Sequence, residues 1–259
     1  MKAFLALLAF LHSADVNVER VTVPGPDGEL DAALVRPDVS AKAPSVVALH
    51  GCGGPFATRD GQWAVALAKA GHIVLLPDSF GSRDLGSQCG SITRTVTASG
   101  LRRLDAIDAG KWLAAQPGTP AGGLVLIGWS NGASTVLQTA RIADDQPANL
   151  FRRFVAFYPG CRETLRTTHW QPSAPVLILM GETDDWTPAA PCRELAAKHA
   201  KEITLITYPD TYHDFDAPDR PVTIQDNAAT AVGGRAHVGT NEHAREDALA
   251  RVPAWLEQP

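Results

Sequence analysis

The sequence lacks a hydrophobic run long enough to cross a membrane, since no segment approaches the roughly 18 uninterrupted apolar residues that a spanning helix needs. It also lacks a basic stripe with interleaved aromatic residues, and its formal net charge is -5. It therefore shows no footprint of a nucleic-acid partner. The composition, 45% hydrophobic and 20% charged, is ordinary for a soluble globular protein. At 259 residues, we expect one domain around one large core.

The four cysteines are too far apart to have the spacing of metal ligands, and the sequence predicts no metal or other cofactor. In an oxidising compartment, Cys52, Cys89, Cys161 and Cys192 allow two disulfides in three connectivities. Cys161 and Cys192 each follow a predicted strand, and those strands should be near neighbours, which favours this pair. In a reducing compartment all four would be thiols.

The N-terminus resembles a short signal peptide. Met1 and Lys2 precede an apolar run over residues 3–11, and His12, Ser13 and Ala14 follow it. This pattern predicts cleavage after Ala14, a mature domain over residues 15–259, and a periplasmic or secreted protein. The alternative is an amphipathic N-terminal helix that is retained in a cytoplasmic protein.

Short apolar, β-branched runs alternate with helical stretches along the chain. The expected strands cover residues 46–49, 73–76, 124–127, 154–157, 176–180 and 203–206, and the expected helices cover 61–70, 98–115, 131–142, 189–198 and 241–257. Runs that are apolar on both faces are typical of parallel strands covered by helices. The sequence thus predicts the α/β class, with a doubly wound, mostly parallel sheet and helices on both faces. Residues 17–23 and 30–35 predict an antiparallel hairpin at the sheet edge.

A candidate nucleophile lies where the strand at 124–127 meets the next helix. Gly128, Trp129, Ser130, Asn131 and Gly132 form the pattern G-x-S-x-G. After a strand and before a helix, this pattern predicts a nucleophile elbow that exposes a serine hydroxyl above the sheet. The alternative is a tight turn in which the serine only caps the helix.

A serine needs a base, and the base needs an acid that fixes its tautomer. His213 is the one histidine of eight that follows a strand on a loop downstream of an acidic loop. Asp184 and Asp185 compete for the role of the acid, and Asp184 is favoured. Of the other histidines, His169 and His237 lie in irregular segments without an acid placed to orient them. Three other aspartates lie near His213 in the sequence, and we expect them to be turn formers rather than the acid. They are Asp210, Asp214 and Asp216.

A glycine-rich segment, His50-Gly51-Cys52-Gly53-Gly54, follows the strand at 46–49. This is where the fold supplies one oxyanion donor, and the residue after the nucleophile supplies the second. The backbone N–H groups of Cys52 and Asn131 are therefore the candidates. A phosphate-binding loop is disfavoured because no G-K-[ST] follows and no dinucleotide fingerprint is present.

These motifs resemble the dienelactone hydrolase family. The resemblance covers about residues 46–215 and rests on the glycine segment, residues 76–83, the elbow, residues 181–188 and residues 212–215. It implies an α/β-hydrolase fold. Members carry G-x-x-D-x-x-x-P after the penultimate core strand, which places the acid on Asp184, and the family histidine falls on His213.

The sequence departs from the family members that open dienelactone. Those members use a cysteine nucleophile where this chain has Ser130, and a glutamate where this chain has Gly51. An arginine that helps to hold the substrate carboxylate is replaced by Ala217. The resemblance is closer to an exported serine branch described mostly as carboxylesterases. Arg83 and Trp129 are the remaining substrate-binding candidates.

The sequence therefore predicts a serine hydrolase that cleaves a small carboxylic ester or lactone through an acyl-enzyme on Ser130. Its expected partner is a small-molecule substrate. One alternative is a small serine peptidase of the prolyl-oligopeptidase type, which shares the order serine, acid, histidine. The other is a binding protein that keeps the hydrolase fold without turnover. Residues 216–240, rich in Gly, Pro and Asp, either cover the site or lead to the last helix.

Overall fold

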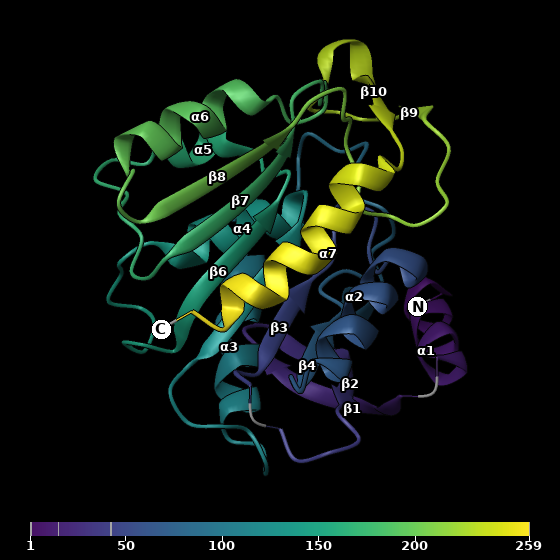
Figure 1. Cartoon of the computed structure of the whole chain (residues 1–259), viewed down its shortest axis with the longest axis vertical. Helices are drawn as coiled ribbons and strands as arrows, with labels where there is room; N and C mark the ends of the chain where they lie inside the picture. The colour runs from purple at the N-terminus through teal and green to yellow at the C-terminus, as the bar shows by residue number, and fades with distance from the viewer. Residues whose placement is uncertain (1, 15, 42, 259) are drawn as a thin grey trace.

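The computed structural model describes residues 2–14, 16–41 and 43–258. Its centre is an eight-stranded sheet in the order β1-β2-β4-β3-β5-β6-β7-β8 (Figure 1). The strands are β1 (Asn17–Gly25), β2 (Gly28–Arg36), β3 (Val46–Leu49), β4 (Val74–Pro77), β5 (Leu124–Trp129), β6 (Phe151–Phe157), β7 (Val176–Gly181) and β8 (Ile203–Tyr208). The six strands from β3 to β8 run parallel, and β1 and β2 form the predicted antiparallel hairpin at one edge.

The middle of the sheet is buried on both faces. Every residue of β3, β4, β5 and β7 is buried, as expected of apolar runs that lie between two layers of helices. Burial of this apolar surface is the main favourable free energy of folding. The predicted α/β fold with a doubly wound, mostly parallel sheet is confirmed.

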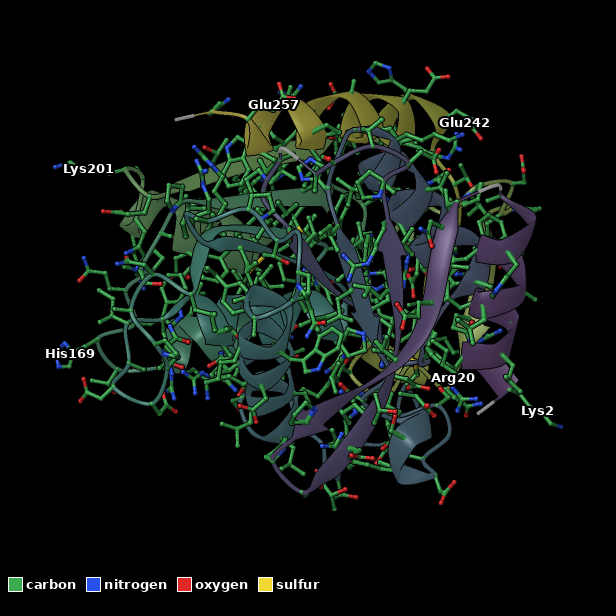
Figure 2. All side chains as sticks on the ribbon, turned by 90° about the horizontal axis from the view of Figure 1, so that it is seen from below. Lys2, Arg20, His169, Lys201, Glu242 and Glu257 are labelled. Atoms are coloured by element: carbon green, nitrogen blue, oxygen red, sulfur yellow. A yellow bond between two sulfur atoms is a disulfide. The ribbon has the colours of Figure 1, made fainter. Side chains whose placement is uncertain are left out.

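Helices cover both faces of the sheet. They are α1 (Lys2–Ser13), α2 (Ala57–Lys69), α3 (Leu101–Ala114), α4 (Asn131–Ala140), α5 (Cys161–Arg166), α6 (Ala189–Lys198) and α7 (Glu242–Leu256). On one face, α2 contacts α1 and α7, while α3, α4, α5 and α6 contact one another in sequence order on the other. Figure 2 shows α7 along the top of the molecule, with Glu242 and Glu257 near its two ends.

The N-terminal segment is a helix in this structure. Phe4, Leu7 and Leu11 of α1 are buried, and the helix packs against α2 and β1. Within the described residues, no helix is both long and apolar enough to span a membrane. Cleavage after Ala14 remains a prediction.

The segment between β8 and α7 contains structure that periodicity did not predict. A second, two-stranded sheet pairs β9 (Thr223–Asp226) with β10 (Arg235–Val238). The strands are too short and too polar to stand out from a loop in the sequence, with Thr223, Ile224 and Asp226 of β9 exposed. Parts of the 216–240 segment border the cleft described below.

Both disulfides join segments that follow strands of the main sheet. Cys161 pairs with Cys192, as predicted from the sequence, and Cys52 pairs with Cys89. The first bond links α5 to α6, and the second links the loop after β3 to the long loop before α3.

Loss of the Cys161–Cys192 bond should weaken the fold measurably. The bond closes a loop with a sequence separation of 31, for which chain entropy predicts a stabilisation of roughly 3–4 kcal/mol. A double variant, Cys161→Ser with Cys192→Ser, should lose about this much free energy of unfolding in urea titrations. A loss below about 1 kcal/mol, or four titratable thiols in the folded wild type, would contradict the pairing.

Candidate active site

The candidate site lies where the winding of the sheet reverses. β3 is flanked by β4 on one side and β5 on the other, so the chain leaves β3 in one direction and later returns past it. Ligands of open α/β sheets bind at such a switch point, beyond the carboxyl ends of the strands. The glycine segment after β3 and the turn after β5 therefore adjoin each other.

The turn after β5 holds Ser130 in a conformation that non-glycine residues rarely adopt, with φ 54° and ψ -114°. Its backbone N–H donates to the Phe157 carbonyl at 2.9 Å. Gly132 packs directly on the neighbouring loop, where an added Cβ would lie 2.2 Å from the Leu49 carbonyl oxygen. A side chain at Gly132 would push the two loops apart, so the second glycine of the motif is needed for this close approach.

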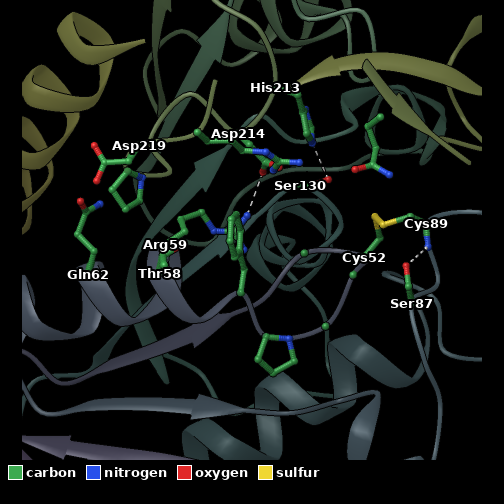
Figure 3. Close-up of a pocket in the computed structure, with 18 of the residues that line it drawn as sticks. Cys52, Thr58, Arg59, Gln62, Ser87, Cys89, Ser130, His213, Asp214 and Asp219 are labelled. Atoms are coloured by element: carbon green, nitrogen blue, oxygen red, sulfur yellow. Dashed lines mark hydrogen bonds and ion pairs between the residues drawn. A yellow bond between two sulfur atoms is a disulfide. The ribbon is translucent and has the colours of Figure 1, made fainter. Parts of the chain in front are cut away.

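Ser130, His213 and Asp184 are connected by hydrogen bonds. The hydroxyl oxygen of Ser130 lies 2.9 Å from His213 Nε2, and Asp184 Oδ2 lies 2.7 Å from His213 Nδ1 (Figure 3 shows the first contact). With the Nδ1 proton donated to the carboxylate, Nε2 is left to accept the serine proton. This is the geometry in which histidine activates a serine hydroxyl.

The environment favours the protonated form of His213. Burial alone would lower the pKa of the imidazole, but the attraction of the Asp184 carboxylate and their hydrogen bond outweigh it, and the pKa is raised. The ring is also enclosed by aromatic neighbours, with the centroid of Tyr158 at 4.5 Å and that of Trp186 at 4.9 Å.

Asp184 is held by the loop that carries it. Its Oδ1 accepts hydrogen bonds from the backbone N–H groups of Trp186 at 2.9 Å and Thr187 at 2.8 Å. The Thr187 hydroxyl donates to Oδ2 at 3.0 Å. These three hydrogen bonds fix the orientation of the Asp184 carboxylate. The carboxylate in turn favours a single orientation of the His213 imidazole.

Asp185, the competing acid, faces elsewhere. It accepts hydrogen bonds at 2.8 Å from both the backbone N–H and the Nδ1 of His237 on β10. The prediction that no acid orients His237 was therefore wrong. The partner was missed because β10 is brought to Asp185 by the second sheet, which the sequence did not predict.

The two candidate oxyanion donors are free to bind a ligand. Asn131 begins α4, so its backbone N–H has no acceptor within the helix. The Cys52 N–H donates to no backbone acceptor among residues 43–258. Cys52, Ser130 and Asn131 line the same cleft, which is described below.

Arg102 of α3 connects the two segments that carry the candidate oxyanion donors, and no sequence pattern predicted this role. Its guanidinium donates to the His50 carbonyl at 2.8 Å and to the Asn131 side chain at 2.7 Å. Burial lowers the pKa of Arg102 to about 10, which still leaves it charged at neutral pH. His50 itself is structural: it accepts from the Ser79 N–H, and burial holds its pKa well below the ordinary value.

A buried carboxylate lies beneath the site. Asp216 Oδ2 accepts from the indole N–H groups of Trp63 at 2.7 Å and Trp129 at 2.8 Å, and Oδ1 accepts from the Tyr158 hydroxyl at 2.6 Å. Asp214 is buried too, bonded to Arg59 at 3.0 Å. Both aspartates lie in a turn after His213, as predicted. Their side chains also bond to partners from distant parts of the chain, which the sequence did not predict.

Neither of the two sequence-predicted substrate-binding residues reaches the site. Arg83 bonds to Asp105 at 2.7 Å and to Asp27 at 3.0 Å, which uses its charge to join η1 (Gly81–Arg83) to the hairpin turn and α3. The Trp129 side chain is fully buried, with its indole N–H on Asp216. These expectations are corrected, because one side chain is ion-paired elsewhere and the other belongs to the core.

Two clefts meet at Ser130. The first, of about 1280 Å³, runs from Ser130 and His213 along α2 to residues 218–221. The second, of about 640 Å³, lies between the 91–98 loop, α5 and the start of α6. Among the described residues, no group of three or more His, Cys, Asp and Glu side chains is placed to hold a metal ion.

The sequence matches the model of the dienelactone hydrolase family over residues 30–259. The chain belongs to this family. Membership makes it an α/β hydrolase that acts on carboxylic esters, and the family resemblance drawn from its motifs is confirmed. No match was found among curated proteins.

Solved structures share the fold at low sequence identity. A putative dienelactone hydrolase from Klebsiella pneumoniae aligns with a TM-score of 0.71 at 18% identity, covering 94% of this chain and 99% of its own. An esterase from Pyrobaculum calidifontis aligns with a TM-score of 0.64 at 19% identity, covering 99% and 92%. The dipeptidyl peptidase 4 of Porphyromonas gingivalis aligns at 0.62 and 17%, covering 93% of this chain but 35% of its own. At these identities the likeness establishes the fold.

Arg102 provides a test of how the oxyanion segments are held. Arg102→Met should lower kcat for ester hydrolysis roughly 10- to 100-fold, since displaced donors lose part of their stabilisation of the oxyanion. Arg103→Met is the matched control, because Arg103 is also buried on α3 but bonds to the Gln138 carbonyl and Asp145. Equal losses of kcat in the two variants would show that Arg102 acts only through general stability.

Proposed function

We propose that the protein is a serine carboxylesterase or lactonase that forms an acyl-enzyme on Ser130. The observation that carries this proposal is the hydrogen-bonded series from Ser130 through His213 to Asp184 at 2.9 and 2.7 Å. Membership of the dienelactone hydrolase family supports the reaction class. The likeness to a solved esterase supports the fold on which this chemistry is built.

In the first half-reaction, Ser130 Oγ attacks the ester carbonyl carbon while His213 Nε2 takes the hydroxyl proton. The carbonyl oxygen becomes an oxyanion that accepts hydrogen bonds from the N–H groups of Cys52 and Asn131. When the tetrahedral intermediate collapses, the carbon–oxygen bond to the alcohol breaks, and the leaving oxygen receives the proton from His213. Ser130 is left as an ester of the acyl group.

In the second half-reaction, a water molecule replaces the alcohol. His213 removes one proton from the water, whose oxygen attacks the acyl carbon, and the same two N–H groups hold the oxyanion. The bond to Ser130 Oγ then breaks, and His213 returns the proton to the serine. The products are the free serine and the carboxylic acid, which ionises at neutral pH. Asp184 stabilises the imidazolium in both halves.

We also propose that the domain over residues 15–259 is exported after removal of residues 1–14. The N-terminal pattern of Lys2 and an apolar run supports removal. Two disulfides support an oxidising compartment, since such bonds are rare in the cytosol. The substrate would then be a small molecule outside the cytoplasm.

Hydrolysis of p-nitrophenyl acetate and butyrate tests the proposal directly. Ser130→Ala should abolish turnover, and Asp184→Asn should reduce kcat by about 10³- to 10⁴-fold, because the imidazole loses its correct tautomer. Asp185→Asn is the matched control and should retain kcat within a few-fold, since Asp185 bonds to His237. Turnover that survives Ser130→Ala would refute the acyl-enzyme, and a loss in Asp185→Asn instead would move the acid role there.

The pH dependence follows from the raised pKa of His213. The base must be neutral to take the serine proton, so activity is lost as the pH falls through this pKa. Because the pKa is raised, the acid limb of kcat/KM should have its midpoint above about 6.5, the ordinary value for histidine. A midpoint at or below that value would contradict the assigned pairing of His213 with Asp184.

A further inference from the structure

The two clefts that meet at Ser130 differ in how their charges are balanced. The first cleft is lined by Arg59 and Arg220, and both guanidinium groups bond to the Asp214 carboxylate. Arg59 also bonds to Asp60 at 2.7 Å. The first cleft is also lined by Lys69, Asp219 and Asp226. Its three cationic and three anionic side chains balance, so the first cleft offers little attraction to an anion.

The second cleft is lined by three arginines without such partners. Arg94 comes from the loop before α3, and Arg162 and Arg166 come from α5. Across the residues that the structure describes, none of the three makes an ion pair. Glu163 is the one acid in the lining, so three positive charges face one negative charge in a protein whose net charge is -5.

Arg94 is the most enclosed of the three. Its side chain is half-buried, and its Nε donates to the Gln88 carbonyl at 2.8 Å. A neutral carbonyl orients the guanidinium but does not compensate its charge. Arg162 and Arg166 are exposed on the opposite wall. A negatively charged group placed between these walls would be attracted by arginines on both sides.

Both walls are fixed by disulfides close to Ser130. Cys52 ties the loop that bears Arg94 to the glycine segment through Cys89, and Cys161 ties α5 to α6. Cys52 and Cys161 themselves line the second cleft. The three arginines therefore lie on segments that the disulfides hold in place, which favours a role in binding an anion.

The position of His213 decides which part of an ester enters which cleft. His213 lines the first cleft but not the second, whereas Asn131 lines the second. The leaving oxygen must receive its proton from His213 Nε2, so the alcohol part departs into the first cleft. The acyl part then extends into the second.

We propose that the second cleft is an anion-binding acyl site, and that the preferred substrates are esters whose acyl chain ends in a carboxylate, that is, half-esters of dicarboxylic acids. This inference rests on the proposed serine esterase function. Arg94, Arg162 and Arg166 select the substrate by binding the terminal carboxylate, and the alcohol part in the first cleft remains neutral.

The test compares esters matched in length that differ in charge. The wild type is assayed by pH-stat with monoethyl glutarate against ethyl valerate, and with monoethyl adipate against ethyl hexanoate. The charged member of each pair should have a kcat/KM at least about tenfold higher at low ionic strength, and the ratio should fall as salt screens the arginines. A ratio near or below one would overturn the proposal.

Variants locate the preference in the cleft. Arg94→Gln with Arg166→Gln should reduce the ratio of charged to neutral kcat/KM at least about tenfold, mainly through KM. Arg152→Gln is the matched control and should leave the ratio unchanged. Arg152 is a half-buried arginine near the start of β6, at the end of that strand away from Ser130, without an ion pair among the described residues. An unchanged ratio in the double variant would overturn the assignment to these residues.

A reversed ester separates the acyl and alcohol sides. In 4-acetoxybutyrate the carboxylate belongs to the alcohol, and its neutral match is butyl acetate. The structure predicts no preference for the charged member of this pair, and a preference that depends on Arg94 and Arg166 would overturn the acyl placement. Failure of the underlying function has a different signature, because p-nitrophenyl butyrate would then show no turnover dependent on Ser130.

Discussion

The buried carboxylate of Asp216 is the point on which the arrangement of the site depends. It accepts one hydrogen bond from each of three elements: Trp63 on α2, Trp129 at the end of β5, and Tyr158 after β6. Burial raises the pKa of Asp216, and the Arg59 charge together with the hydrogen bonds from Tyr158 and Trp63 offsets part of this desolvation cost. Because Asp216 lies on the loop that carries His213, and Trp129 precedes Ser130, the same carboxylate holds the base above the nucleophile.

The parts of the site that the sequence could predict are those fixed by local rules. A strand that runs into G-x-S-x-G predicts the elbow at Ser130, since few backbone paths join a buried strand to a helix through that pattern. The order of strands and turns likewise places His213 and the 184–185 pair at the same sheet edge. Chain order alone left Asp184 and Asp185 to compete; the Asp184 carboxylate lies 2.7 Å from His213, and Asp185 lies with His237.

The parts that the sequence could not predict depend on contacts between distant residues. Arg102 lies near the start of α3, next to Arg103 and close to Asp105, and nothing local shows that it bonds to His50 and Asn131. Arg83 shows the opposite case. Its position within a motif that resembles the family predicted contact with the substrate, but its guanidinium forms ion pairs with Asp27 and Asp105. The partners of these arginines come together only in the folded protein. There, burial makes an unpaired charge costly, so the pairing depends on the tertiary structure.

The hydrogen-bonded residues Ser130, His213 and Asp184 and the arginines of the second cleft are held in place by different interactions. Ser130, Asp184 and His213 follow β5, β7 and β8 of the main sheet, so the sheet sets their spacing. The walls of the second cleft lack that support: the loop before α3 has little regular structure, and α5 has six residues. Each wall is instead cross-linked, at Cys89 and at Cys161. A cross-link restricts such a segment where packing alone would not, and a fixed charge loses less entropy on binding than a mobile one. Arginine recognition on these walls is therefore consistent with an oxidising compartment, because there the covalent support persists.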